Sequence, residues 1–154
     1  MGDLTKNFSL VEFLVSSKAT ELGIANTPTP EHRRRITQVT APSLQKVRDL
    51  VGVSVNITSA YRNPQINAAV GGSATSDHPK AWAVDCNAAG FSLLAFARFV
   101  RDHMRQGQPL EGMIDQLIYE RHRTVHISFA PGRRGQVLTQ HGGPKSPFLS
   151  GIVP

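Results

Sequence analysis

Three residues of this chain carry side chains that can bind a metal, and their spacing suggests how they are held: His78, Asp85 and His126. His78 follows a Gly- and Ser-rich segment, and Asp85 lies inside the short apolar stretch 82–86. His126 lies in the run Thr-Val-His-Ile-Ser-Phe at 124–129, which alternates with the two-residue period of a strand and aims the imidazole away from three apolar neighbours. Two imidazoles and a carboxylate leave a fourth tetrahedral position for water, an arrangement typical of catalytic zinc.

Three short motifs surround these residues. Ser-x-His-x-x-Ala-x-Ala-x-Asp spans 76–85, Ser-Ala-Tyr-Arg-Asn precedes it at 59–63, and Val-His-Ile-Ser follows at 125–128. In this order the motifs resemble those of the zinc D-alanyl-D-alanine carboxypeptidases, a group that also holds the vancomycin-resistance dipeptidases and the L-alanyl-D-glutamate endopeptidases used as phage endolysins. The resemblance covers about residues 8–130. It implies an α+β fold of the D-Ala-D-Ala carboxypeptidase/hedgehog-like kind: a small antiparallel sheet backed by helices, with the zinc site at the sheet face.

The resemblance also implies a role for individual residues. It makes the two histidines and the aspartate the ligands of one Zn²⁺ ion, and Arg62 the cation that faces the substrate's carbonyl or carboxylate. A planar, permanently charged guanidinium suits that task. Ser76 and Ser128 stand where their hydroxyls can hydrogen-bond the substrate peptide or the second nitrogen of a ligand histidine.

Hydrolysis also requires a general base, which takes a proton from water and delivers it to the leaving amine. Many family members place an acidic residue three positions before the second histidine, but that position here is Arg123, which cannot act as a base. The nearest carboxylate is Glu120, and the segment 115–120 resembles a branch of the family in which a glutamate ends this strand. We therefore predict Glu120 as the base, with a solvated turn residue as the alternative interpretation. His122 and Asp115 are weaker candidates.

Another departure from the family pattern concerns the backbone between the first two ligands. The glycine usual four residues before the aspartate is Ala81 here. Because alanine has a side chain where the family often needs a permissive backbone, we expect this loop to follow a slightly different path.

The hydrophobic pattern predicts the elements that position these side chains. Ser9 and Glu12 form a capping box at the start of a first helix. A second helical run begins at Pro30, ends at Gly52 and contains Pro42, which should kink or divide it. Strands are predicted at 53–58, 116–120 and 124–129, the last two as a hairpin, and further helices at 63–70 and 93–106. From about residue 131 the chain is rich in Gly, Pro and basic residues, which predicts an irregular tail.

Composition limits what the site can be. With 154 residues we expect one catalytic domain over 1–154. The single cysteine, Cys86, excludes an internal disulfide and a four-thiolate zinc site. A net charge of +6 favours a polyanionic partner, here an anionic cell-envelope polymer, although a solvated basic surface is the alternative. Nucleic acid ranks low because two Tyr and one Trp form no base-stacking pattern.

The termini and the apolar content suggest where the protein works. The N-terminus lacks the basic start and apolar core of a secretory signal, and no stretch approaches the roughly 18 apolar residues of a membrane span. We expect synthesis in the cytoplasm and action in the cell wall or periplasm after release by lysis. The expected state is a monomer.

Two interpretations of function remain open at this point. The first is a zinc peptidase that hydrolyses peptidoglycan stem peptides, as a D,D-carboxypeptidase or an endopeptidase, with a phage lysin as one form. The second is a non-catalytic cell-wall-binding or phage structural module that retains the fold and the metal site. Arg123 at the usual base position is the main support for the second.

Overall fold

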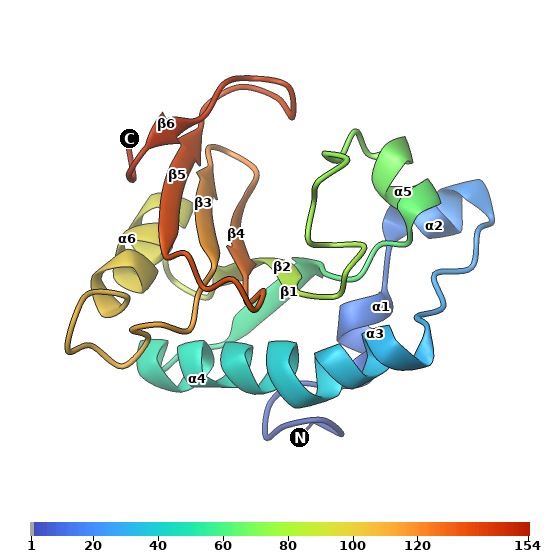
Figure 1. Ribbon diagram of the computed structural model, residues 1–154, viewed down its shortest axis with the longest axis horizontal. Helices are drawn as coiled ribbons and strands as arrows, with labels where there is room; N and C mark the ends of the chain where they lie inside the picture. Colours follow the sequence, from blue (N-terminus) through green and yellow to red (C-terminus); the bar gives the residue numbers. More distant parts are fainter. Residues whose placement is uncertain (1) are drawn as a thin grey trace.

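A six-stranded sheet with the strand order β1-β2-β4-β3-β5-β6 runs through the molecule (Figure 1). The computed structural model describes residues 2–154. The strands are β1 (Val55–Ser59), β2 (Ala83–Ala88), β3 (Gln116–Glu120), β4 (Thr124–Ser128), β5 (Gln136–Gln140) and β6 (Leu149–Ser150). Neighbouring strands are antiparallel except β3 and β5, which are parallel.

Helices back this sheet and close its core. They are α1 (Leu10–Leu14), α2 (Ser17–Leu22), α3 (Pro30–Arg35), the π-helical turn η1 (Ile36–Thr40), α4 (Ala41–Val51), α5 (Pro64–Ala69) and α6 (Leu93–His103). One buried cluster joins α4 and α6 to the sheet through Leu44, Val47, Phe96 and Val100. The predicted α+β fold, with a largely antiparallel sheet backed by helices, is confirmed. Within residues 2–154, no helix combines the length and apolar character needed to cross a membrane.

One face of β4 packs in the hydrophobic core and the other carries His126, as the alternation of its residues predicts. Val125 and Ile127 are fully buried members of the hydrophobic core. His126 points to the other face, opposite Asp85 of β2 and Ile118 of β3. The face that carries His126 therefore also carries the Asp85 side chain from the neighbouring strand.

The long helical run is divided before Pro42, as predicted. The N–H of Ala41 bonds the carbonyl of Ile36, five residues back, which gives the widened turn η1 between α3 and α4. Proline has no N–H to donate to the carbonyl four residues before it, and its ring clashes with that carbonyl. A wider turn before Pro42 relieves this clash. Thr40 at the end of this turn is buried, and its hydroxyl donates to the carbonyl of Ala81 (2.7 Å). The helix is thus tied to the loop between the first two candidate ligands.

The prediction of an irregular tail from about residue 131 is wrong for two segments. β5 pairs with β3 in parallel, and β6 pairs with β5. β5 covers the edge that β3 would otherwise expose, and its hydrogen bonds satisfy both strands. A five-residue strand bordered by glycine-rich turns has too little alternation to stand out from such a composition. The sequence pattern likewise marks β2 only as an apolar stretch without alternation, because its residues are buried on both faces.

Ala81 adopts a backbone conformation that favours glycine. Its φ is 66°, in the left-handed region, and its side chain is buried. Its N–H donates to the carbonyl of His78 (3.1 Å), and its own carbonyl accepts from Thr40. The loop therefore keeps a left-handed residue at this place although the side chain is an alanine.

We predict that Ala81→Gly changes the free energy of unfolding by less than about 1 kcal/mol. Relief of the left-handed conformation, worth roughly 1–2 kcal/mol, is offset by the lost buried methyl group (about 0.8 kcal/mol) and the greater chain entropy of glycine. Ala81→Val, which puts a branched side chain at the same φ in a buried position, should cost roughly 3 kcal/mol. Chemical denaturation measures both. A loss above about 2 kcal/mol for the glycine variant would show that packing of the methyl group outweighs strain.

Candidate metal centre

The structure brings the three candidate ligands together. One ligand atom from each of His78, Asp85 and His126 lies within 4.8 Å of the others. Nε2 of His78 is 3.2 Å from Oδ1 of Asp85, and Nδ1 of His126 is 3.0 Å from the same oxygen. All three residues are buried. The predicted convergence of two imidazoles and a carboxylate is therefore present.

Different elements supply the three side chains. Asp85 and His126 lie opposite each other on β2 and β4, whereas His78 lies in the loop before β2. Nδ1 of His78 hydrogen-bonds the carbonyl of Ala60 (2.6 Å). Because a carbonyl oxygen only accepts, Nδ1 carries the proton, and in the neutral ring the lone pair of Nε2 points toward Asp85. The loop and the start of the segment after β1 together orient this ring.

The centre lies in a cleft with a volume of about 730 Å³, a usual size for a ligand site. Residues 70–80 form one wall, and Gln140, Pro144 and Phe148 contribute to the other. A Cβ at Gly71 would lie 3.9 Å from Cγ of Pro144, so the two walls meet there. In Figure 1 the loop between β5 and β6 extends from the end of the sheet on the side of these segments. The C-terminal part of the chain thus covers one part of the cleft.

Arg62 lies beside the centre, as predicted. Its Nη1 is 3.7 Å from Oδ2 of Asp85 and donates to Oγ of Ser59 (3.1 Å), while its Nε donates to Oδ1 of Asn67 (3.3 Å). A β-bulge between Ile57 and Ser59 shifts the register of β1, which sets Ser59 opposite Asp85. Burial lowers the pKa of Arg62, and the charge of Asp85 opposes that effect. An arginine side chain stays charged in proteins, so it contributes a positive charge of fixed position.

Glu120 faces the same cleft from the end of β3. It lies on the face that carries Ile118, which is paired with His126. Burial raises the pKa of Glu120, and the charge of Asp85 raises it further, against the opposing charges of His126 and Arg123. Nη2 of Arg123 is 3.2 Å from Oε1 of Glu120 and donates to Oε1 of Gln140 (2.8 Å). Glu120 is therefore a largely buried cleft residue, which removes the alternative of a solvated turn residue.

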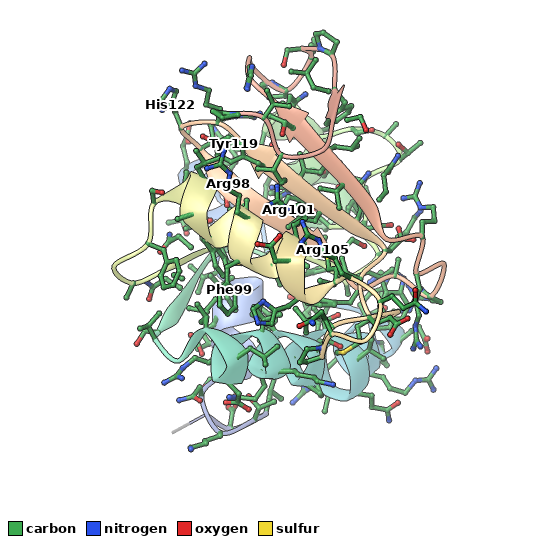
Figure 2. The ribbon with its side chains drawn as sticks, turned by 90° about the vertical axis from the view of Figure 1, so that its left-hand side faces the viewer. Arg98, Phe99, Arg101, Arg105, Tyr119 and His122 are labelled. Carbon is green, nitrogen blue, oxygen red and sulfur yellow. The ribbon has the colours of Figure 1, made fainter. Side chains whose placement is uncertain are left out.

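The weaker base candidates lie elsewhere. His122 is exposed in the β3–β4 turn with a φ of 62°, and it points away from the rest of the molecule in Figure 2. Asp115 lines the cleft, but both of its carboxylate oxygens accept hydrogen bonds from the guanidinium of Arg134. Those bonds hold the pKa of Asp115 below its ordinary value. Neither residue is placed as well as Glu120 to exchange a proton near the centre.

A family model for Peptidase M15 matches residues 6–128 of the chain. The chain belongs to the Peptidase M15 family. The matched segment contains the three candidate ligands and ends with β4, so it confirms the resemblance to zinc D-alanyl-D-alanine carboxypeptidase-like metallopeptidases that the motifs indicate. A search of the curated proteins finds no match to the chain.

The two serines of this M15 peptidase are engaged by protein groups. Oγ of Ser76 accepts from the N–H of His78 (3.2 Å), and Oγ of Ser128 donates to Oδ2 of Asp77 (2.6 Å). The second nitrogen of His78 bonds the carbonyl of Ala60, so neither Ser76 nor Ser128 orients that ring, contrary to the prediction from the motifs. The sequence motifs do not single out Asp77, whose only signal is its place beside His78. The serines thus hold the loop that carries His78.

Electrostatics in the centre fit a divalent cation. Burial lowers the pKa of His78, which favours its neutral, ligating form. Burial acts against ionisation of Asp85, but the hydrogen bond and the positive charge of His126 help to hold its pKa well below the ordinary range. Burial would lower the pKa of His126, but its hydrogen bond to Asp85 raises it, so a cation bound here would replace a proton. Two nitrogens and one carboxylate with an open side suit zinc.

We predict that the protein binds one equivalent of zinc and melts at a higher temperature with it. Zinc at 100 times its dissociation constant should stabilise the fold by about 2.7 kcal/mol, because only the folded chain assembles the three ligands. His126→Ala should lose the bound zinc and the shift in melting temperature. His122→Ala is the matched control and should keep both. Elemental analysis after dialysis and thermal melting give the two readouts, and equal zinc uptake by the His126 and His122 variants would contradict the assignment.

Proposed function

We propose that this M15 family member is a zinc peptidase that hydrolyses peptide bonds in peptidoglycan stem peptides, as a D,D-carboxypeptidase or an endopeptidase. The observation that carries the proposal is the grouping of His78, Asp85 and His126 within 4.8 Å in a cleft that Arg62 and Glu120 also line. Three protein ligands with one side open are typical of catalytic rather than structural zinc. A zinc ion held there would supply Lewis acidity toward the scissile carbonyl and make water more acidic.

Arg62 is proposed to stabilise negative charge that develops on the carbonyl oxygen of the substrate. Ser59 and Asn67 hold its guanidinium, so little reorganisation is needed during the reaction. Its side chain is only 13% exposed, and a charge in such a poorly solvated place acts strongly on a nearby oxygen. Arg62 would therefore act as an oxyanion-stabilising group without being a metal ligand.

Glu120 is proposed as the general base that takes the proton from water and returns it to the leaving amine. A raised pKa suits this double role, because the group must both accept and release a proton near neutral pH. Arg123 contacts Glu120 and is itself held by Gln140. Arg123 was the main support for a non-catalytic module, but it lies beside the proposed base. Its position therefore favours the enzyme over the binding module.

The proposed site of action is the cell wall or periplasm, reached after lysis of the producing cell, as for a phage lysin. The net charge of +6 supports this, because a positive protein is attracted to anionic wall polymers. The protein is proposed to act there as a monomer.

We predict that Glu120→Gln leaves zinc binding intact but lowers turnover roughly 10²- to 10⁴-fold, because the amide cannot accept the proton. The assay measures new amino groups released from purified sacculi by the zinc-loaded protein. Glu21→Gln, an exposed substitution on α2, is the matched control and should retain the wild-type rate. A Glu120→Gln variant with full activity would assign the base to another group.

A further inference from the structure

Arg134 lies in the tight connection between β4 and β5, at the margin of the cleft. Backbone hydrogen bonds from Gly135 to Ile114 (3.0 Å) and from Gln136 to Asp115 (3.0 Å) fasten this connection to the segment before β3. Gly132 permits the close approach, since a Cβ there would lie 3.0 Å from Oδ1 of Asp115. The backbone that carries Arg134 therefore has a defined position.

The carboxylate of Asp115 holds the guanidinium of Arg134 in place. Nε of Arg134 donates to Oδ1 (3.0 Å), Nη2 donates to Oδ2 (2.8 Å), and the backbone N–H of Arg134 donates to Oδ1 (3.0 Å). The Asp115 side chain is 5% exposed, so the carboxylate is buried while the arginine covers it. Such a two-pronged pair sets the plane of the guanidinium as well as its position.

Arg134 is more exposed than the other two arginines that line the cleft. The exposed fraction of its side chain is 55%, against 13% for Arg62 and 33% for Arg123. In the described part of the chain, residues 2–154, no acceptor contacts its Nη1. Asp77 is the other carboxylate whose charge reaches Arg134, but it already accepts from Ser128 and lies 3.8 Å from Nζ of Lys80. The outer edge of the guanidinium is therefore free to take an external anion.

We infer that Arg134, held by Asp115, is a specificity-determining residue that binds a carboxylate of the peptide substrate. This inference rests on the proposed function and deepens it. The free N–H groups of a planar guanidinium bind a carboxylate more strongly than they bind a carbonyl group. The reason is that hydrogen bonds between a cation and an anion are stronger than those to a neutral acceptor. The expected ligand is thus an acidic peptide.

The position of the subsite along the sheet indicates which part of the substrate it reaches. Asp115 bonds the backbone carbonyl of Ser128 through its own N–H (2.9 Å), and Ser128 lies two residues beyond His126 on β4. Two residues of strand span about 7 Å. An extended peptide advances by a similar length per two residues, so the recognised carboxylate lies about two residues from the bond beside the metal centre.

The test uses a synthetic stem peptide, L-alanyl-D-glutamyl-L-lysyl-D-alanyl-D-alanine, and two forms of it. One form has the free glutamate carboxylate converted to the amide, and the other has the C-terminal carboxylate converted. For the zinc-loaded wild type, one of these amidations should lower kcat/KM about 10- to 100-fold, mainly through KM. In Arg134→Gln the same amidation should change kcat/KM less than about 2-fold. The form that responds identifies which carboxylate the subsite takes.

Controls separate recognition from a merely structural clamp. Arg98→Gln, on the outer side of α6 and away from the site face, should keep the full penalty for amidation (Figure 2). Arg134→Lys, which keeps the charge without the fork, should show a reduced penalty. If Arg134 only fastens the loop, its variants will melt earlier yet lose as much from amidation as the wild type, and the inference is overturned. If the wild type cleaves none of the three peptides, the proposed function itself fails and the subsite with it.

Discussion

The antiparallel pairing of β2 with β4 is the constraint on which the rest of the site depends, because it places Asp85 opposite His126. On the other face of the same pair, Val84 lies opposite Ile127, and both are fully buried. Side chains alternate with a period of two, so a slip of one residue would turn these two candidate ligands into the core and the core residues into the cleft. Hydrophobic packing on one face of the sheet therefore maintains the alignment of the two candidate ligands on the other face.

The same arrangement has an electrostatic cost that the site offsets locally. A buried carboxylate is unfavourable unless charges or hydrogen bonds compensate it. Asp85 receives that compensation from His126, which hydrogen-bonds its Oδ1, and from Arg62, whose Nη1 lies 3.7 Å from its Oδ2. A site that holds a carboxylate ionised between two nitrogen donors is arranged for a cation. The departures from the family pattern fit this arrangement: Ala81 keeps a left-handed backbone in the ligand loop, and Arg123 pairs with Glu120.

The sequence predicted those features that depend on neighbouring residues. The alternation around His126, the capping box at Ser9 and the division of the helix before Pro42 are all local, and all three are confirmed. The motif order indicates the three candidate ligands, and the predicted hairpin of the last two strands brings Glu120 to the face that carries His126.

Features formed by distant segments left no signal of that kind. The parallel pairing of β5 with β3 joins segments twenty residues apart, and nothing in a basic, glycine-rich tail specifies that partner. The bond from His78 to the carbonyl of Ala60 uses a backbone acceptor, which any residue type provides. The ion pair between Asp115 and Arg134 likewise depends on the turn that brings the two residues together. Neither their residue types nor their spacing in the sequence predicts that pair.

The central claim is that His78, Asp85 and His126 form one zinc site. A crystal structure of the zinc-loaded protein, with anomalous data collected at the zinc edge, tests it most directly. We expect one strong anomalous peak about 2.0–2.2 Å from Nε2 of His78, a carboxylate oxygen of Asp85 and Nδ1 of His126. A peak bound by other residues, with these three side chains still hydrogen-bonded to one another, would contradict the account.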